Sequence, residues 1–405
     1  MFYVGIDWAD QKHHVFIVDE EGREIEVLVI PHDYKGLSRL RDSLRKLAAP
    51  KDQILIALET SKGLLVDFLL QEGFTLYPIN PKAVDRYRDR YRASQAKSDF
   101  FDALVLANIL RTDRERFRPL LPDTPLTREL RILTRDQQHL ITMQTRLVLK
   151  LEACLKDYYP VALGLFSELC QPLTLDFLET FPQPAPVSLT RLKKFFREHH
   201  YPQPEQKAKE VYEKLTAPQI PVEEFTIRAK SRLLLTLIAE LRVLSQQLKG
   251  YDREIARLFC EHADHPMFQS LPGAGPKIGP RLLAQMGDNR DRYTTANQVQ
   301  GEAGTAPVTR ASGKYKIVIL RRACRKPFRN VVHQFAFCSL RESKWARQFY
   351  DQQITSGKTH AEALRALGHK WLKIIFRLWQ DRVLYDESYH LARLEHYKLG
   401  ALFTT

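Results

Sequence analysis

The chain has 405 residues, of which 44% are hydrophobic and 27% charged, and its formal net charge is +14. This composition is typical of a globular protein of about two to four domains. No apolar run approaches the roughly 18 residues of a membrane span, and the N-terminus lacks the pattern of a signal peptide. The five cysteines lie far apart without a CxxC pair, which excludes a disulfide framework or a zinc knuckle. We therefore expect a cytoplasmic, reduced protein that does not associate with membranes.

The positive charge is concentrated in the C-terminal part of the chain. Residues 1–112 hold 16 Lys and Arg against 17 Asp and Glu, whereas the remainder holds 46 against 31. Between Ala303 and Leu340 there are eight basic residues and no acidic one. This distribution, with a pI near 9.5, favours a polyanionic partner.

The N-terminal third alternates between apolar runs and helix-like segments. It predicts strands over 2–7, 13–19 and 23–30, a helix over 36–48, a strand that ends at Glu59, a helix over 63–72, a strand over 74–79 and a helical stretch over 81–112. A three-strand meander followed by alternating helices and strands predicts a mixed sheet with helices on its faces. The fold class is therefore α/β in this part, in an order compatible with the ribonuclease H arrangement.

Four carboxylates of this region occupy suggestive positions. Asp7 ends the run FYVGID and Glu59 ends the run ILIALE, while Asp99 and Asp102 open the helical stretch three residues apart and share one helix face. If the strands are neighbours and the helix crosses their ends, the four acids converge. Such a cluster requires cations, and oxygen ligands suit Mg²⁺, with Mn²⁺ as a substitute. Paired divalent ions are a recurring device for cleaving phosphodiesters.

Each of these acids also has an ordinary structural explanation. Asp7 suits a turn at a strand end, and Asp99 and Asp102 suit the N-terminus of a helix dipole. Asp10 and Asp19 are nearby substitutes that occupy loop-like positions. His13 and His14 we interpret as strand residues without a metal role.

The middle of the chain is expected to be helical. Residues 128–157 have helical apolar spacing, and residues 160–224 form a proline-interrupted insertion of short helices. A heptad seam then steps by three and four through Leu234, Leu237, Leu241, Leu244, Leu248, Tyr251, Ile255 and Leu258. The strict 3.5-residue spacing predicts a coiled coil through which chains associate; the alternative is a long core helix of a monomeric bundle.

The C-terminal part is predicted to be mostly helical. Residues 266–288 read as helix, Gly/Pro turn and helix, and the turn PGAGPKIG resembles a helix-hairpin-helix whose backbone N–H groups hold a phosphate. A turn that connects helices without any ligand fits the same residues. The segment ASGKYKIVIL reads as a turn and a strand, and basic helices are expected over about 322–350 and 359–383.

Taken together, these motifs resemble a known family. Their order runs from GIDWADQKHHVFIVD through ALETS and AKSDFFDA to LPGAGPKIGPRLLAQMGD and ASGK. It is similar to that of insertion-sequence 110 transposases, which are related to the Piv DNA invertase. The resemblance covers both ends of the chain and is weakest across 160–224. The basic stretch RRACRKPFRN departs from it, since it lacks the Gly-Asn found in relatives.

The resemblance implies a recombinase guided by a structured bridge RNA that pairs with target and donor DNA. It implies a RuvC-like DEDD domain over 1–118, a coiled-coil region over 119–262 with the insertion at 160–224, a transposase domain over 263–345 and a helical extension over 346–405. The DEDD residues, catalytic and metal-binding, would be Asp7, Glu59, Asp99 and Asp102. The family also uses a serine nucleophile in a Ser-Gly motif, which corresponds here to Ser312; from the residues alone, Ser312 is a turn serine. The expected partners are double-stranded donor and target DNA, the guide RNA and further copies of the chain, as a dimer or tetramer.

Basic residues are the candidates for nucleic-acid contacts. In the segment 86–97, arginines alternate with Tyr87 and Tyr91, which suits looped RNA, although a solvated helix face is an equal explanation. The expected contacts are Arg86, Arg88, Arg90, Arg92, Lys277, Lys314, Arg321, Arg322, Arg325, Lys326 and Arg329.

Three other functions remain as alternatives. A stand-alone RuvC-like nuclease of the Holliday-junction resolvase type would use the acids with water as nucleophile. A sugar-kinase or actin-like ATPase would need a second glycine-rich phosphate loop, which the sequence does not show. A non-catalytic RNA-binding protein would keep the acids as structural groups.

Overall fold

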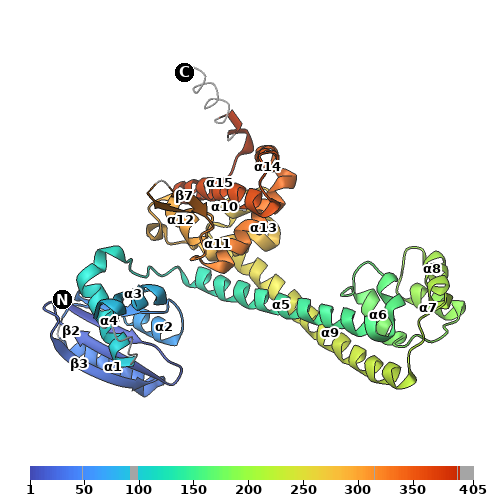
Figure 1. Ribbon diagram of the computed structural model, residues 1–405, viewed down its shortest axis with the longest axis horizontal. Helices are drawn as coiled ribbons and strands as arrows, with labels where there is room; N and C mark the ends of the chain where they lie inside the picture. The colour runs from blue at the N-terminus through green and yellow to red at the C-terminus, as the bar shows by residue number, and fades with distance from the viewer. Residues whose placement is uncertain (48, 92–98, 314, 390, 393–405) are drawn as a thin grey trace. The chain divides into compact units, whose positions relative to one another are not determined.

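The computed structural model describes residues 1–47, 49–91, 99–313, 315–389 and 391–392 of the chain. The chain divides into two compact units, Met1–Pro122 and Asp123–Thr405, and each is described here by itself (Figure 1). Arg92 and Lys314, two of the expected nucleic-acid contacts, lie outside the described residues.

The first unit contains a five-stranded mixed sheet. The strands are β1 (Phe2–Asp7), β2 (Lys12–Val18), β3 (Glu24–Pro31), β4 (Ile54–Leu58) and β5 (Thr75–Pro78), in the spatial order β3-β2-β1-β4-β5. β3, β2 and β1 pair antiparallel, and β1, β4 and β5 pair parallel. The predicted strands and mixed sheet are therefore confirmed.

Helices cover both faces of this sheet. They are α1 (Tyr34–Lys46), α2 (Leu64–Gln71), α3 (Pro81–Tyr91) and α4 (Asp99–Asp113). Val4 and Ile6 face a core shared with α1 and α2, whereas Tyr3 and Leu55 face a second core shared with α4. This division follows from the two-residue period of a strand. The helical stretch expected over 81–112 is divided between α3 and α4, and residues 92–98 between them are outside the described part.

α4 lies against the middle of the sheet at close range. Almost all of its residues from Phe101 to Leu110 are buried, which agrees with its apolar sequence on every side. A Cβ atom added to Gly5 would lie 2.6 Å from the backbone nitrogen of Ala107 and closer still to the carbonyl oxygen of Ala103. Gly5 thus allows the backbone of α4 to approach β1 directly.

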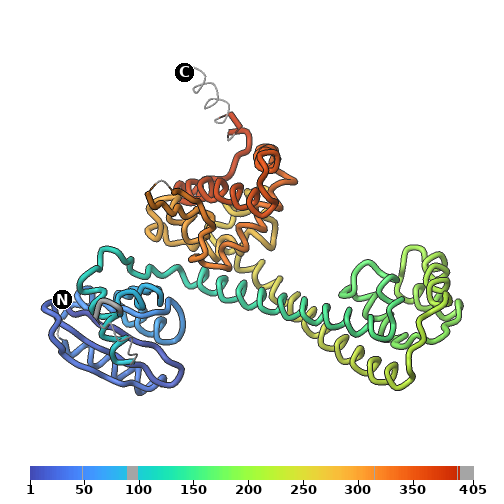
Figure 2. The backbone as a smooth tube through the Cα atoms, in the orientation of Figure 1, coloured from blue at the N-terminus to red at the C-terminus, as the bar shows by residue number. Residues whose placement is uncertain are grey.

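The second unit is built on two long helices, α5 (Pro125–Tyr158) and α9 (Glu224–Glu261), which pack along each other as a helical hairpin (Figure 2). The heptad residues Leu234, Leu241 and Ile255 are buried within this unit. The seam therefore has a partner in its own chain, and the expectation of an unpaired stripe that recruits a second chain is wrong for these residues. The segment 160–224 is long enough for the chain to reverse direction, so that α9 packs along α5 of the same chain.

Short helices fill the insertion between α5 and α9. They are α6 (Pro172–Thr180), α7 (Leu189–Glu198) and α8 (Pro204–Thr216), and two of them start at a proline in the first turn, where its missing N–H costs nothing. Their aromatic residues Phe177, Phe195 and Phe196 form a core with the adjoining ends of α5 and α9. The short helices predicted over 160–224 are therefore confirmed.

The remaining elements lie at the other end of the hairpin, where most of the helices share a further core. They are α10 (His265–Gln269), α11 (Gly275–Met286), α12 (Ala296–Glu302), β6 (Val308–Ser312), β7 (Tyr315–Ile319), α13 (Lys326–Glu342), α14 (Lys344–Thr355) and α15 (His360–Asp381). Trp371 and Trp379 of α15 are fully buried there with Phe328 and Phe335 of α13. β6 and β7 pair antiparallel as a two-stranded ribbon.

Candidate active site

Two of the predicted acids end neighbouring parallel strands. The register of β1 and β4 pairs Ile6 with Leu58, so Asp7 and Glu59 follow at the same edge of the sheet. Alternation along each strand places both side chains on the α4 face, with Gly5 and Ala57 one pleat earlier. Both carboxylates are partly exposed.

The other two acids begin the helix that covers this face. Asp99 is exposed and Asp102 is buried, at 3% exposure. Their distance from Asp7 is set by the close packing of α4 on Gly5, because Asp102 directly precedes Ala103 at that contact. The structure brings Asp99 and Asp7 together, and both belong to one group of potential ligand atoms that lie within 4.8 Å of one another.

The third member of that group is His14, which we had expected to be a strand residue without a metal role. β2 pairs with β1 so that His14 lies opposite Asp7, on the same face of the sheet. Its Nδ1 atom is 3.7 Å from Oδ2 of Asp99. The sequence contains the information that places His14 beside Asp7, because a short connection between two strands fixes which residues pair across them.

Asp102 has a cationic partner of its own. The guanidinium of Arg88, from α3, donates to Oδ1 of Asp102 from Nη2 at 2.7 Å and from Nε at 2.8 Å. Arg88 also reaches Asp85 at 3.0 Å. A buried carboxylate requires such a donor, so Arg88 is engaged at the acid cluster rather than presented to a nucleic acid. The prediction of a nucleic-acid contact at Arg88 is therefore not supported by its position.

The donor atoms fit a divalent cation. Ions held by oxygen and nitrogen at about 2.1–2.4 Å require ligand atoms no more than about 4–5 Å apart, which Asp7, His14 and Asp99 satisfy. Nδ1 of His14 is a buried atom without a hydrogen-bond partner in the described part of the chain, as expected of a ligand atom. Glu59, on the neighbouring strand, and Asp102, on the same helix as Asp99, are the adjacent carboxylates.

Ser312 occupies a different kind of position, at the tip of the β6–β7 ribbon. It is the last residue of β6, is exposed, and pairs in register with Tyr315. Gly313 follows with a φ of 55°, the left-handed conformation that a tight hairpin turn needs. No hydrogen bond of the Ser312 hydroxyl occurs among the residues that the structure describes. The ribbon thus presents an exposed hydroxyl at its tip.

The basic residues of the C-terminal part fall into two groups. Arg325 is half-buried, and its guanidinium is paired with Glu302 and donates to the side chain of Gln285 at 3.0 Å. Arg321 donates to the carbonyl of Ala306 at 3.2 Å. These contacts hold both side chains against neighbouring segments of the same unit. The exposed set consists of Arg322 and Lys326, with Arg329 partly exposed.

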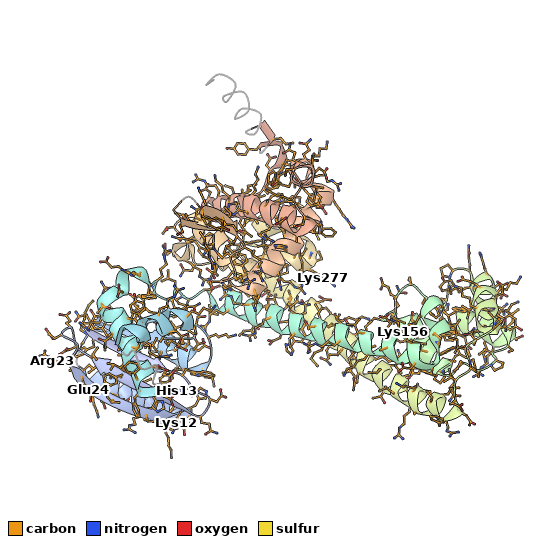
Figure 3. All side chains as sticks on the ribbon, viewed as in Figure 1. Lys12, His13, Arg23, Glu24, Lys156 and Lys277 are labelled. Carbon is orange, nitrogen blue, oxygen red and sulfur yellow. The ribbon has the colours of Figure 1, made fainter. Side chains whose placement is uncertain are left out.

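The remaining expected contacts lie on helices. Arg86 on α3 is exposed, and Arg90 lies on the same helix. Lys277, labelled in Figure 3, stands in the first turn of α11, with its ammonium 3.9 Å from Asp252 of α9.

A backbone N–H group of the Gly/Pro turn before α11 already has a hydrogen-bond partner within the chain. The N–H of Gly273 donates to the carboxylate of Glu342 at 2.6 Å, and a Cβ atom at Gly273 would meet the backbone of Cys338 at 2.6 Å. The predicted order of helix, Gly/Pro turn and helix is confirmed by α10 and α11. The expected phosphate contact at the Gly273 amide is not supported, because a side chain of α13 already occupies that donor.

Comparison with known proteins defines the class. A transposase family model of the IS110 DEDD type matches residues 4–160, and a model described as the transposase IS116/IS110/IS902 family matches residues 265–351. The chain is 34% identical over 404 residues to the mini-circle putative transposase for IS117 of Streptomyces coelicolor, and the match covers 97% of both chains. It is 24% identical over 392 residues to the 43.6 kDa protein of insertion element IS110 from the same species, covering 95% of each. A putative transposase, y4uE, of Sinorhizobium fredii is 38% identical over 184 residues, covering 45% of this chain and 51% of that protein.

These matches identify the chain as a member of the IS110 family of transposases, enzymes that act on DNA. The DEDD class implies a divalent metal cofactor, in agreement with the group formed by Asp7, His14 and Asp99. Within the described residues, no helix is long and apolar enough to span a membrane.

Proposed function

We propose that this transposase cuts and rejoins DNA strands with a Mg²⁺-dependent site formed by Asp7, Glu59, Asp99 and Asp102 and with Ser312 as the nucleophile. The observation that carries the proposal is the placement of acids from two parallel strand ends and one helix start on a single face of the sheet. The mixed five-stranded sheet is consistent with a RuvC-like domain over 1–118. We further propose the coiled-coil region over 119–262, the transposase domain over 263–345 and the helical extension over 346–405.

The role of the acids is electrostatic. The bound metal would supply positive charge that stabilises the phosphate in the transition state and lowers the pKa of an attacking hydroxyl. Asp7 and Asp99 would hold it, and Glu59 and Asp102 would complete the negative potential that attracts it. Arg88 neutralises Asp102 in its absence, which offsets the cost of burying that carboxylate.

Ser312 would carry the covalent step. Its Oγ forms a bond to the phosphorus of the scissile phosphate as the bond from phosphorus to one sugar oxygen breaks. The serine proton leaves to a base, and the released sugar oxygen takes up a proton to become a hydroxyl. A hydroxyl of another DNA end then attacks the serine phosphodiester, restores the DNA linkage and returns the proton to Ser312. One phosphodiester is exchanged for another throughout, so rejoining needs no ATP.

The partners follow from the charge distribution and from the family. Donor and target DNA would contact the exposed cations Arg322, Lys326 and Lys277 and the partly exposed Arg329. Among the described residues, Lys277 alone of these four has an ion pair with a carboxylate, that of Asp252. A bridge RNA would guide the choice of sites, with Arg86 and Arg90 as contacts on α3. We propose a homo-oligomer, a dimer or tetramer, in which a metal site of another copy activates Ser312, as the family resemblance implies.

Covalent trapping on labelled DNA tests the nucleophile. Wild-type protein with Mg²⁺ and its co-purified RNA is expected to form a protein–DNA adduct on denaturing gels. Ser312→Ala should bind RNA and DNA normally and form no adduct, whereas Thr309→Ala, an exposed hydroxyl on the same ribbon, should form it. An adduct that persists in Ser312→Ala would refute the assignment. Metal-dependent cleavage by Ser312→Ala without an adduct would instead favour the nuclease that uses water.

Matched variants test the acids in the same assay. Asp99→Asn should abolish strand breakage at unchanged stability, because Asp99 is exposed, and Asp10→Asn, an exposed acid of the neighbouring loop, should not. Sequencing the nucleic acid that co-purifies with the protein tests the guide: one structured RNA supports it, and a random mixture contradicts it.

A further inference from the structure

His14 is a buried imidazole beside the acid cluster. It is 6% exposed and lies on β2 in register with Asp7 of β1. Because successive side chains of a strand alternate, its neighbour His13 (labelled in Figure 3) lies on the opposite face of the sheet, and its Nε2 is 2.8 Å from Nδ1 of His32. The two histidines of one strand therefore have different surroundings, and His14 alone faces the acids.

The imidazole of His14 packs against a neighbouring ring, but its Nδ1 atom has no hydrogen-bond partner among the described residues. The ring of Phe100 packs edge-on against it, with 4.6 Å between ring centroids. Within the part of the chain that the structure describes, Nδ1 makes no hydrogen bond, and its approach to Asp99 at 3.7 Å is too long for one. A buried nitrogen without a partner is costly, and such groups in folded proteins usually have a role. Here the free nitrogen and two carboxylates form one group whose atoms lie within 4.8 Å.

We propose that Nδ1 of His14 is a nitrogen ligand of the divalent metal ion that Asp7 and Asp99 hold. The neutral imidazole with its proton on Nε2 presents a lone pair at Nδ1. This inference rests on the proposed function, which supplies the metal, and adds to the four acids a ligand of a different chemical class.

A nitrogen ligand changes which metal the site prefers. Mg²⁺ binds oxygen almost exclusively, whereas first-row transition ions accept imidazole readily. The site with His14 should therefore bind Mn²⁺ considerably more tightly than Mg²⁺. An all-oxygen site formed by the carboxylates alone would discriminate less between the two ions.

Electron spin echo spectroscopy of Mn²⁺ bound to the full-length protein tests the ligand directly. The wild type is expected to show modulation from a coordinated ¹⁴N nucleus. His14→Asn places an amide near the Nδ1 position, and His14→Phe preserves the aromatic packing against Phe100; both should lose this modulation. His139→Asn, which removes an exposed histidine of α5, should retain it.

Metal titration gives the second readout. His14→Asn should weaken Mn²⁺ binding about tenfold or more, in the range seen when the surroundings of metal sites are altered, and change Mg²⁺ binding by less than about threefold. Melting curves recorded without metal identify any variant that fails to fold. If either His14→Asn or His14→Phe fails to fold, the other still tests the ligand.

The outcomes separate this inference from the proposed function. If Mn²⁺ binds, is lost in Asp7→Asn and shows no ¹⁴N modulation in wild type, His14 is not a ligand while the acid site stands. Modulation that persists in both His14 variants overturns the inference in the same way. If no Mn²⁺ binding depends on Asp7, both the inference and the metal-dependent site are wrong.

Discussion

Replacing Gly5 with Ala should damage the acid site although Gly5 carries no functional group. A methyl group at this position would stand 2.6 Å from the nitrogen of Ala107 and closer to the carbonyl oxygen of Ala103. Carbon atoms in proteins keep about 3.5 Å from such neighbours, so α4 must retreat by about 1 Å. Both opposing groups are backbone atoms of a buried helix, so no side chain can rotate away.

The retreat of α4 should have two measurable consequences. Overpacking of this kind costs about 1–3 kcal/mol of stability. Because Asp99 and Asp102 move with the helix, a displacement of about 1 Å from the ligands on β1 should reduce DNA cleavage by roughly 100-fold. Cleavage rates under single-turnover conditions, Mn²⁺ titration and thermal melting measure these effects.

A second Gly→Ala replacement serves as a control, because it removes a glycine without displacing a helix. Gly250 lies in α9, and a Cβ atom there would meet nothing within 4 Å. Gly250→Ala should therefore leave cleavage unchanged and stabilise the helix by up to about 1 kcal/mol. If Gly5→Ala cleaves DNA and melts like the wild type, the contact between α4 and β1 does not position the acids as we infer.

Two further predictions concern pH and salt. Burial, followed by repulsion from His32 and His14, lowers the pKa of His13 from 6.5 to about 4, so stability is full above pH 6.5 and should fall by about 3 kcal/mol as the pH approaches 4. Urea midpoints across that range should show the loss, and His13→Phe should reduce it; a flat profile would contradict a buried neutral imidazole. Arg322→Ala with Lys326→Ala should flatten the slope of log K for DNA against log salt by about two, whereas Arg325→Ala should lower the melting temperature with less effect on the slope. If Arg325→Ala flattened the salt slope and the Arg322 and Lys326 double variant lowered only the melting temperature, the roles assigned to these three residues would be wrong.

The sequence predicted most elements of the first unit because local patterns decide them. Short apolar runs separated by turn residues gave the five strands, and the order of strands and helices gave a mixed sheet. It also placed Asp7 and Glu59 at strand ends, which the parallel register of β1 and β4 brings to the same edge. These conclusions needed only neighbouring residues in the chain.

The contacts that sequence reasoning missed all depend on tertiary packing. Arg88 looked like a nucleic-acid contact because its surroundings in the chain are basic, yet it pairs with Asp102, 14 residues away. The heptad seam of α9 shows that an apolar stripe needs a partner, but not whether that partner is α5 of the same chain or a second chain. Gly5 gave a detectable signal, since a glycine inside an apolar strand indicates close approach of another backbone.

In the proposed function, the chemistry of strand exchange is divided between the acid cluster and Ser312, and each of the two is incomplete by itself. The acid cluster of the first unit has ligand atoms for a metal but holds no serine or other nucleophile assigned to the reaction. Ser312 of the second unit has an exposed hydroxyl but no hydrogen-bonded base among the described residues. A serine hydroxyl without a base or metal is a weak nucleophile. In the proposed function, cleavage therefore requires that DNA engage both groups at once, and a protein bound to DNA through its basic surface alone would leave the strands intact.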